Sequence, residues 1–210
     1  LGIAKSTAHR LLISLESEGF ITKDPETSLY RLGVSFLSLG NAIIKNMKLY
    51  THSTSILQFL QKATGETSGV MVLEKEYAYV VNIVESHHPI RYSTYIGQEE
   101  SVYCSSTGLA ILAFQSPKII DAIKEKAPIP AKEFEQKIEF IRSNGYYVSI
   151  NEFYKHFTSI AVPVRNGGGE VIAALAIAGP SERILPKNIS SIAKTIISAS
   201  DQLSKMLMFD

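Results

Sequence analysis

The feature of this sequence that most constrains its fold is a change in the spacing of apolar residues near Thr67. Before this residue, apolar side chains recur every three or four positions, as in Phe36, Leu39 and Ile43, which predicts helices with one buried stripe. After it, runs such as residues 70–73 are continuously apolar and β-prone. A chain with this change of period is expected to hold a helical N-terminal part and a larger part built around a sheet.

The first 33 residues predict a helix followed by a β-hairpin. Residues 4–18 place four apolar side chains on one helix face, with Ser6 and Thr7 expected to cap its start and Gly19 expected to end it. Residues 20–32 hold two short β-prone runs around a polar segment. This is the second half of a winged helix. Since the chain opens inside the pattern without a Met, we expect a further segment upstream.

The remaining elements predict an α+β fold with a central antiparallel sheet and helices outside it. A helix too apolar to stand alone in water is expected over 34–47, packed on another helix or another subunit. The further expected helices are 56–64, 108–114, 117–126, 131–143 and 188–207, and the expected strands are 70–73, 79–84, 90–95, 146–148, 158–164 and 170–178. Gly167, Gly168 and Gly169 supply the turn between the last two strands.

Composition narrows the class of protein. Lys and Arg total 21 against 20 for Asp and Glu, so a contact with nucleic acid would need a local basic patch. Cys104 is the only cysteine, which excludes an intrachain disulfide and a cysteine-cluster zinc site and suits a reducing cytoplasm. The sequence contains no apolar run of membrane-spanning length.

The predicted helix over 4–18 carries a pattern suited to reading DNA. Its early polar and basic side chains project away from the apolar stripe, where they could reach base edges and phosphates. These residues are Lys5, Ser6, Thr7, His9 and Arg10. Lys23 and Arg31 of the hairpin would lie along the DNA backbone. The alternative is an ordinary amphipathic surface helix, since residues 1–31 hold four basic and four acidic residues.

Residues 1–32, LGIAKSTAHRLLISLESEGFITKDPETSLYRL, resemble the second half of the helix-turn-helix and the wing of the IclR family of bacterial and archaeal regulators. Residues 33–40 are similar to that family's link into its connecting helix. A spaced signature of the family is also matched near the far end, except at Arg165, where an aromatic residue or His is expected. The matching positions are Gly145, Ser149, Glu152, Ser159, Ile160, Ala161, Val164 and Asn166. We expect the mismatch to alter the glycine turn more than the pocket.

The resemblance implies a ligand-responsive transcriptional regulator, a repressor or an activator, without a metal or cofactor. Its domains would be an incomplete winged helix-turn-helix (1–33), a linker helix (34–48) and a GAF-like effector-binding domain (49–210). The implied partners are a double-stranded DNA operator, a small organic effector, and a second copy in a homodimer or a dimer of dimers. The effector residues implied by the family are Tyr92, Ser106, Thr107, Ser149, Ser159, Ala176 and Ala178. Tyr103 is a further tyrosine expected to face the ligand.

Two departures bear on the effector. Relatives that bind small oxoacids carry serines where this chain has Ala176 and Ala178, and an acid and a cysteine where it has Ser149 and Ser159. Because fewer donors face a carboxylate, we expect an effector that is larger or less polar than pyruvate or glyoxylate. Hydroxyls at 105–107, before a predicted helix, could bind an anion or carbonyl, or simply cap the helix.

Two other classes remain open at this point. The larger domain could be an enzyme for a small molecule, but Cys104 has no His nearby in sequence and is expected to be a buried structural cysteine. His87 and His88, beside Pro89, favour an exposed turn over a metal site. The larger domain could also be an interaction module whose own side chains fill its pocket, and a cavity search would discriminate this alternative.

Overall fold

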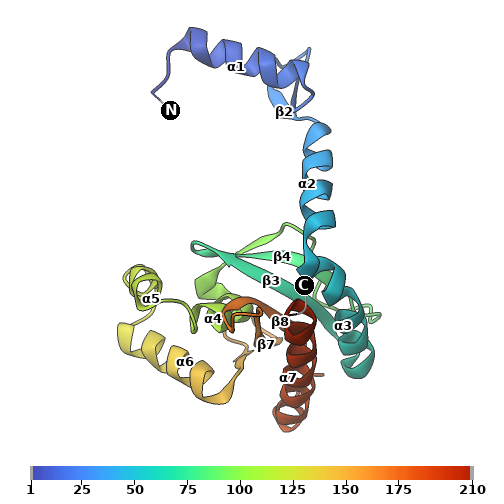
Figure 1. Ribbon diagram of the computed structural model, residues 1–210, viewed down its shortest axis with the longest axis vertical. Coiled ribbons are helices and arrows are strands. Elements are labelled where there is room, and N and C mark those ends of the chain that lie inside the picture. The colour runs from blue at the N-terminus through green and yellow to red at the C-terminus, as the bar shows by residue number, and fades with distance from the viewer. Residues whose placement is uncertain (1, 209–210) are drawn as a thin grey trace. The chain divides into compact units, whose positions relative to one another are not determined.

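The structure, a computed structural model, describes residues 2–208 of the 210-residue chain. It divides into two compact units, Leu1–Met47 and Lys48–Asp210 (Figure 1). We refer to them below as the N-terminal unit and the sensor unit. The predicted order of a helical N-terminal part before a sheet-containing part is therefore confirmed.

The N-terminal unit contains α1 (Lys5–Ser17), β1 (Ile21–Lys23), β2 (Tyr30–Leu32) and α2 (Ser35–Asn46). The end of α1 is the one expected: Gly19 adopts φ +72°, and the N–H of Phe20 donates to the carbonyl of Leu15 at 2.8 Å. The start of α1 differs from the prediction. Ala4 is the N-cap and no side chain caps it, because the helix begins before Ser6 and Thr7 can act from outside it.

Two glycines hold the hairpin against the end of α1. The N–H of Gly33 donates to the carbonyl of Phe20 at 2.6 Å, and a Cβ on Gly33 would lie 2.0 Å from the carbonyl oxygen of Gly19. This close approach requires glycine at position 33. The rings of Phe20 and Phe36 then meet edge to face, 5.3 Å apart between centroids.

The N-terminal unit nevertheless has no buried residue between positions 2 and 47. The stripe of α1 that includes Leu11 is largely exposed, and so are Leu37 and Ile43 of α2, which are 74% and 64% exposed. The predicted helices are present, but the described part of this unit does not cover their apolar faces.

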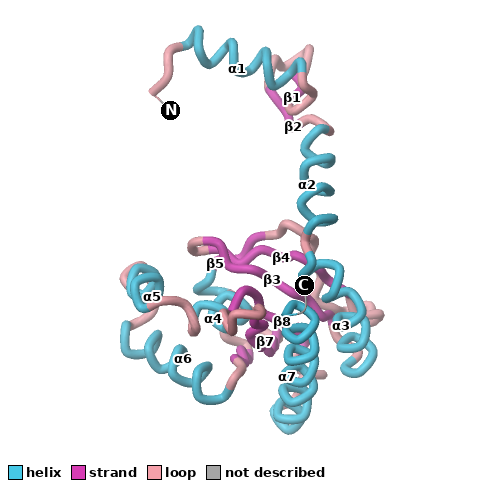
Figure 2. The backbone as a smooth tube through the Cα atoms, in the orientation of Figure 1, coloured by secondary structure: helices cyan, strands magenta, loops and turns pink. Residues whose placement is uncertain are grey.

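The sensor unit is built on one six-stranded sheet in the order β5-β4-β3-β8-β7-β6 (Figure 2). All of its pairings are antiparallel, as predicted. The strands are β3 (Thr67–Glu74), β4 (Tyr77–Val84), β5 (Glu99–Ser101), β6 (Tyr147–Ile150), β7 (Phe157–Arg165) and β8 (Val171–Pro180). The glycine turn joins β7 to β8, with Gly169 at φ +82° and the Asn166 side chain accepting from the N–H of Gly168.

Helices cover the two faces of this sheet. On one face α3 (Lys48–Thr64) packs beside α7 (Pro186–Met208), and α4 (Ser106–Leu112) packs on the other face, with α6 (Ala131–Asn144) against it (Figure 1). A short 3₁₀ turn (Val102–Cys104) precedes α4, and α5 (Pro117–Lys124) follows it. Every residue of α4 is buried, so α4 is the central helix of this layer. Pro117 begins α5 at a first-turn position, where proline needs no N–H partner.

The prediction of a strand over residues 90–95 is wrong. This segment is extended loop, and the edge strand β5 lies further along, at Glu99–Ser101. The carbonyls of the loop accept from side chains instead of a neighbouring strand: Thr67 donates to the carbonyl of Tyr92 at 2.6 Å, and Arg183 donates to that of Ile90 at 2.9 Å. These distant partners satisfy the backbone without a ladder.

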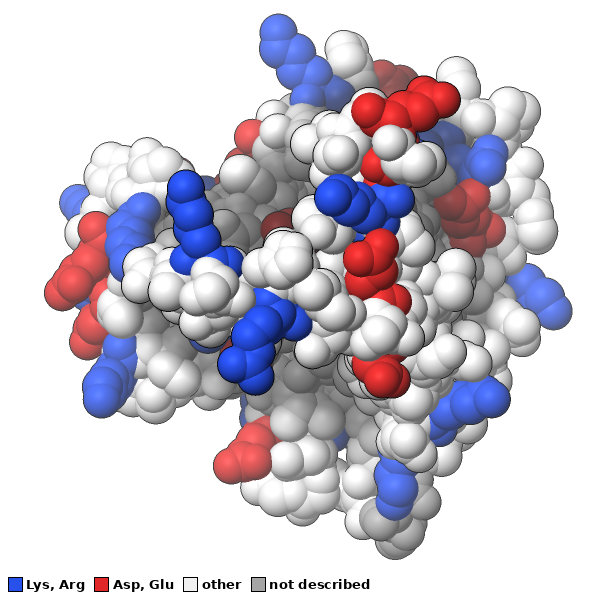
Figure 3. Space-filling view, turned by 90° about the horizontal axis from the view of Figure 1, so that it is seen from above, with Lys and Arg blue, Asp and Glu red and all other residues white. Residues whose placement is uncertain are grey.

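The face of the molecule seen from above carries charges of both signs. In the view of Figure 3, Lys and Arg side chains are interspersed with Asp and Glu across the face shown. None of the helices between residues 2 and 208 is both long and apolar enough to span a membrane.

Candidate functional site

The polar residues predicted to read DNA all lie on the exposed surface of the first two turns of α1. Lys5, Ser6, Thr7, His9 and Arg10 are solvent-accessible. The first turn of α1 contains no acidic residue. Within residues 2–208, neither Lys5 nor Arg10 forms an ion pair. Both side chains are therefore available to phosphate oxygens, which bind well near the N-terminus of a helix.

The hairpin presents its two predicted cations differently. Lys23 is exposed, with its ammonium 5.9 Å from the centroid of the Tyr30 ring. Arg31 is exposed too, but its guanidinium pairs with Asp24 at 2.6 Å. Hydrogen bonds from Thr27 to Asp24 hold the pKa of that carboxyl below its usual value, so the acid stays ionised and partly neutralises Arg31. Lys23 is the stronger candidate for a phosphate contact.

Six of the eight predicted effector residues gather at one cavity of about 40 Å³, which we call the inner chamber. They are Tyr92, Ser106, Thr107, Ser159, Ala176 and Ala178. The chamber lies between the sheet and the start of α4, because β7, β8 and α4 pack together and each contributes small or hydroxyl-bearing residues. The sequence pattern thus brings together residues separated by more than 80 positions.

The hydroxyls at the start of α4 form a connected network. Ser105 accepts from the N–H of Gly108 at 3.2 Å, so it caps the helix as one of the two alternatives predicted. Ser159 donates to the hydroxyl of Ser106 at 2.8 Å, and Thr107 lies 2.9 Å from the sulfur of Met71. Ser106 and Ser159 thus face the chamber with donor and acceptor capacity that one mutual bond does not exhaust.

The other two predicted effector residues do not line the chamber. Ser149 pairs with Ser159 across β6 and β7, so it lies on the same face of the sheet, one strand further out. It is 1% exposed, and its hydroxyl has no partner within the described chain. Tyr103 turns the other way: its hydroxyl donates to the carbonyl of Ile123 at 2.7 Å, because its ring packs into the core beside α5.

Tyr92 forms one wall of the inner chamber and is held by an acid. Its hydroxyl donates to Glu100 at 2.5 Å. Burial, together with the negative charge of Glu100, raises the pKa of the Tyr92 phenol above its ordinary value, so the ring carries no charge at neutral pH. The extended segment at 90–95 places Tyr92 here.

Two further hollows adjoin the inner chamber. An open groove of about 480 Å³, which we call the outer groove, shares Tyr92, Glu100, Cys104 and Tyr154 with it. A second chamber of about 40 Å³ lies on its other side and shares Met71, Tyr92, Ala176 and Ala178. Cys104 is exposed at the mouth of the outer groove, which corrects the expectation of a buried cysteine. Tyr92, present in all three linings, is the residue around which they meet.

Sequence reasoning missed half of the inner chamber. The missed lining residues are Met71, Glu100, Cys104, Phe153, Tyr154 and Phe157. The aromatic residues at 153, 154 and 157 fall inside the family signature, where three rings in a polar stretch were a usable signal. Glu100 gave no such signal, because its position follows from the loop that was expected to be a strand.

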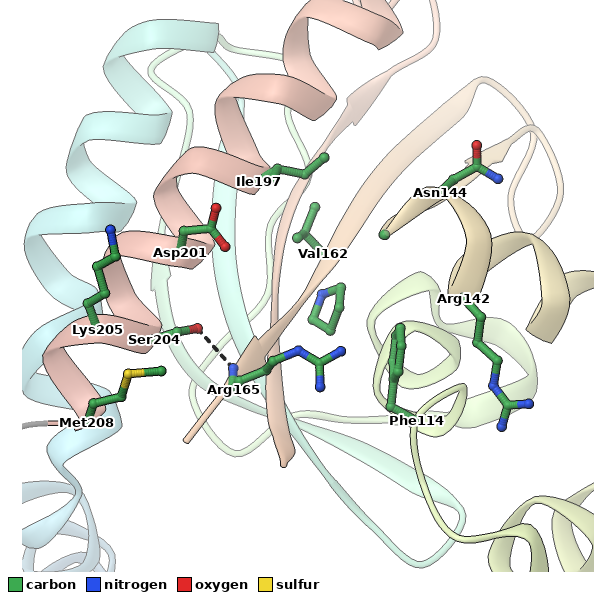
Figure 4. Close-up of a pocket in the computed structure, with 12 residues that line it drawn as sticks. Phe114, Arg142, Asn144, Val162, Arg165, Ile197, Asp201, Ser204, Lys205 and Met208 are labelled. Atoms are coloured by element: carbon green, nitrogen blue, oxygen red, sulfur yellow. Dashed lines mark hydrogen bonds between the residues drawn. The ribbon is translucent and has the colours of Figure 1, made fainter. Parts of the chain in front are cut away.

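Arg165, the departure from the family signature, lies in a different groove of about 430 Å³ (Figure 4). Its guanidinium donates to the carbonyl of Gly169 at 2.8 Å and stands 4.7 Å from the centroid of the Phe114 ring. Arg142 flanks that ring from the other side and donates to the carbonyl of Ala113 (Figure 4). The groove contains no predicted effector residue. Arg165 therefore bonds within the glycine turn, away from the inner chamber.

The described residues give little support to a metal site. His87 and His88 are exposed in a bend, as expected for a turn. Between residues 2 and 208 no group of three or more His, Cys, Asp and Glu side chains could hold a metal ion.

Two family descriptions match the chain. The one for the C-terminal domain of the bacterial transcriptional regulator IclR matches residues 41–205. The one for the IclR helix-turn-helix domain matches residues 1–25. Together they extend from the start of α1 into the last helix, and the first alone covers well over half of the sequence.

Individual relatives agree with these matches. The chain is 27% identical to the glycerol operon regulatory protein of Streptomyces griseus, over 89% of this chain and 76% of that one. It is 27% identical to the transcriptional repressor YiaJ of Escherichia coli, over 99% and 78%. A solved structure assigned to the IclR regulators, from Silicibacter sp., superposes with a TM-score of 0.84 at 25% identity, over 99% and 85%.

These matches decide between the classes left open by the sequence. The family consists of transcriptional regulators, which excludes the enzyme alternative, and its two domains account for both the exposed helix start and the sheet domain with its chamber. The chain belongs to the IclR family of transcriptional regulators, which bind DNA through a helix-turn-helix domain and a ligand through the C-terminal domain.

Proposed function

We propose that the start of α1 reads the major groove of a DNA operator while the β1–β2 hairpin lies along the phosphate backbone. The observation that carries this proposal is the exposed, unpaired pair Lys5 and Arg10 on a first turn without acids. Ser6, Thr7 and His9 would supply further contacts to bases and phosphates, and Lys23 and Arg31 would contact the backbone. The operating unit would be residues 1–33, joined by a linker helix over 34–48 to the effector domain over 49–210.

This part is tested by DNA binding with matched variants. An operator is first selected from genomic fragments, and affinities are measured by fluorescence anisotropy over a range of salt concentrations. Arg10→Ala is expected to weaken binding about 10-fold or more, as for loss of a base contact. Lys23→Ala should lower the number of counterions released on DNA binding by about one, as obtained from the salt dependence of the affinity. Lys62→Ala, an exposed cation on α3, is the control. Equal effects of Arg10→Ala and Lys62→Ala would refute the assignment.

We infer that two copies associate through the apolar face of α2, giving a homodimer that can pair again into a tetramer. Leu37, Leu39 and Ile43 are exposed on a helix whose stripe is wide enough to pack against another helix. Ile43→Asp should convert dimer to monomer in analytical ultracentrifugation, whereas Lys45→Asp on the same helix should not. A monomeric wild-type chain at micromolar concentration would contradict this inference.

The effector is proposed to bind in the inner chamber, against Tyr92, Ser106, Thr107 and Ser159, with Ala176 and Ala178 forming its apolar floor. The buried, unpartnered hydroxyl of Ser149 supports a polar ligand group reaching toward β6. Because the chamber measures about 40 Å³, the loop carrying Tyr92 has to move for a ligand of several carbons to enter. The apolar floor supports an effector larger or less polar than pyruvate or glyoxylate.

Native mass spectrometry of the purified protein and calorimetric titration test the effector site. Ser159→Ala should weaken the effector about 5- to 10-fold, the usual range for one lost hydrogen bond in a buried site. Thr195→Ala removes a half-buried hydroxyl on α7, which donates to the carbonyl of Ser191 and lines none of the three hollows, and it should not change the affinity. A two- or three-carbon oxoacid as the tightest ligand would contradict the size and polarity proposed.

In this mechanism the bound effector shifts the population of arrangements that place two DNA-binding units on one operator. Operator affinity measured with and without the effector should differ by the same factor as effector affinity with and without operator, because the coupling is reciprocal. The protein would act in the cytoplasm, where its operator lies.

A further inference from the structure

Three aromatic rings meet at the junction of the inner chamber and the outer groove. The ring centroid of Phe157 lies 5.2 Å from that of Tyr92 and 5.9 Å from that of Tyr154. All three residues line the inner chamber, and Tyr154 is 57% exposed, so this end of the cavity opens to solvent. The faces of aromatic rings carry negative electrostatic potential and attract cations, most strongly where several rings surround one position.

The charged side chains at the same place are acidic. Glu100 lines both the inner chamber and the outer groove, and Glu99 lines the groove. The carboxylates accept hydrogen bonds from tyrosine hydroxyls: Tyr92 donates to Glu100, and Tyr79 donates to Glu99 at 2.9 Å. No Lys, Arg or His lines either hollow in the described chain.

Cations near this place are either paired elsewhere or outside the lining. Arg91 pairs with Glu85 at 2.8 Å, and Arg183 pairs with the buried Glu66. Lys155 follows Tyr154 in sequence but lines neither hollow. A carboxylate ligand would therefore enter beside Glu100 without a countercharge, which is costly at a half-buried position. A positively charged group would instead meet Glu100 and three aromatic rings.

We propose that the effector is an organic ammonium compound, whose cationic nitrogen lies among Tyr92, Tyr154 and Phe157 beside Glu100 and whose apolar body extends over Met71, Ala176 and Ala178. This inference rests on the effector site proposed above and names the class of its ligand. On binding, the cationic nitrogen replaces the Tyr92 hydroxyl as the partner of the Glu100 carboxylate. That exchange couples ligand entry to the loop that carries Tyr92.

The experiment compares compounds of equal shape and different charge. Phenethylamine, 2-phenylethanol and phenylacetate form one set, and choline and its uncharged analogue 3,3-dimethylbutanol form another, within a larger library built on the same principle. Binding to the 210-residue chain is measured by thermal shift and calorimetry. We expect the ammonium members to bind about 10-fold or more tightly than their neutral or anionic counterparts. An anion as the tightest ligand, or a library in which no cation binds, overturns the proposal.

Variants separate the two contributions to cation binding. Glu100→Gln should weaken ammonium ligands about 10-fold and leave neutral analogues unchanged, and Glu182→Gln, an exposed acid outside the cavity, should change neither. Tyr154→Leu should weaken ammonium ligands about 3- to 10-fold, with Tyr154→Phe restoring them, because the ring face and not the hydroxyl is used. Since Tyr154 is exposed, these variants should fold even where Glu100→Gln does not. Equal affinity of the Leu and Phe variants for an ammonium ligand would contradict the aromatic contribution.

Failure of this proposal is distinguishable from failure of the effector site. If an anionic compound binds tightly and Ser159→Ala weakens it, the site stands and only the charge of its ligand is wrong. If the best ligand is indifferent to Ser159→Ala, the site itself is wrong.

Discussion

Helices α2 and α3 carry the same kind of apolar stripe, but the stripe is buried in α3 and exposed in α2. Leu57 and Leu60 of α3 are completely buried against the sheet, whereas Leu37 and Ile43 of α2 remain mostly exposed. The contrast extends to the two units: every buried hydrophobic side chain in residues 2–208 lies in the sensor unit, and residues 2–47 contain no buried residue. Helical periodicity therefore predicts a helix and its apolar face, but the partner of that face has to be found in the three-dimensional structure.

The strongest test of this comparison is to truncate one leucine in each helix. Leu57→Ala should lower the free energy of unfolding by about 3–4 kcal/mol, because it leaves a cavity in a core that cannot collapse fully. Leu37→Ala should change it by less than about 0.5 kcal/mol in dilute solution. Urea denaturation followed by circular dichroism measures both. A comparable loss for Leu37→Ala at low protein concentration would show that α2 is covered within the chain.

The N-terminal unit should instead be sensitive at its glycines. Gly33→Ala places a methyl group against the carbonyl of Gly19, which forces the hairpin away from α1 at a cost of about 2–3 kcal/mol. We expect operator affinity to fall about 50-fold, while unfolding of the sensor unit stays unchanged. Gly40→Ala, where an added Cβ meets nothing within 4 Å, is the control. Similar losses for both variants would mean that close backbone approach is not what holds this unit.

Within the sensor unit, a buried acid anchors three distant segments. Glu66, directly before β3, is 2% exposed and pairs through both oxygens with Arg183, which also donates to the carbonyl of Ile90. Glu66→Gln should cost about 2 kcal/mol, less than for a fully buried pair because the Arg183 side chain is 30% exposed. The exposed pair His156 and Glu182 is the matched control, and Glu182→Gln should leave the denaturation midpoint where it was.

The same contrast explains which parts of the fold could be predicted from the sequence and which could not. Local signals predicted α1, the hairpin and the glycine turn, because Gly19 and Gly169 act through their own backbone angles. The family resemblance supplied six residues of the inner chamber. Residues 90–95 were misassigned because their partners, Thr67 and Arg183, are remote in sequence.

The charge of the cavity was beyond prediction for a related reason. Glu100 reaches the chamber only because the 90–95 segment is a loop and β5 begins after it. Tyr103 was expected to face the ligand, but α5 offers its hydroxyl the carbonyl of Ile123 on the opposite side. Position in a motif can be read along a chain, whereas the direction of a side chain depends on what packs beside it.

The smallest expected effect compares one half-buried acid from each unit. Asp24 in the hairpin has a pKa below the ordinary 3.8, chiefly through the backbone N–H of Thr27, and Glu85 has one below 4.5, chiefly through the hydroxyl of Ser93 and then Arg91. Since each pKa is lowered by folding, the stabilisation is complete above the ordinary value and is lost as the pH falls through the lowered one.

Amide shifts measured by NMR between about pH 5 and pH 2 test this. The Thr27 amide should move as Asp24 protonates, and the Ser93 region should move with Glu85. Asp24→Asn should abolish the first response and leave the second, because an amide still accepts from Thr27 but does not titrate. If the Thr27 amide shift still depends on pH in that variant, it reports unfolding of the whole N-terminal unit and not protonation of Asp24 in the turn. The hairpin is then less independent of its surroundings than its local hydrogen bonds indicate.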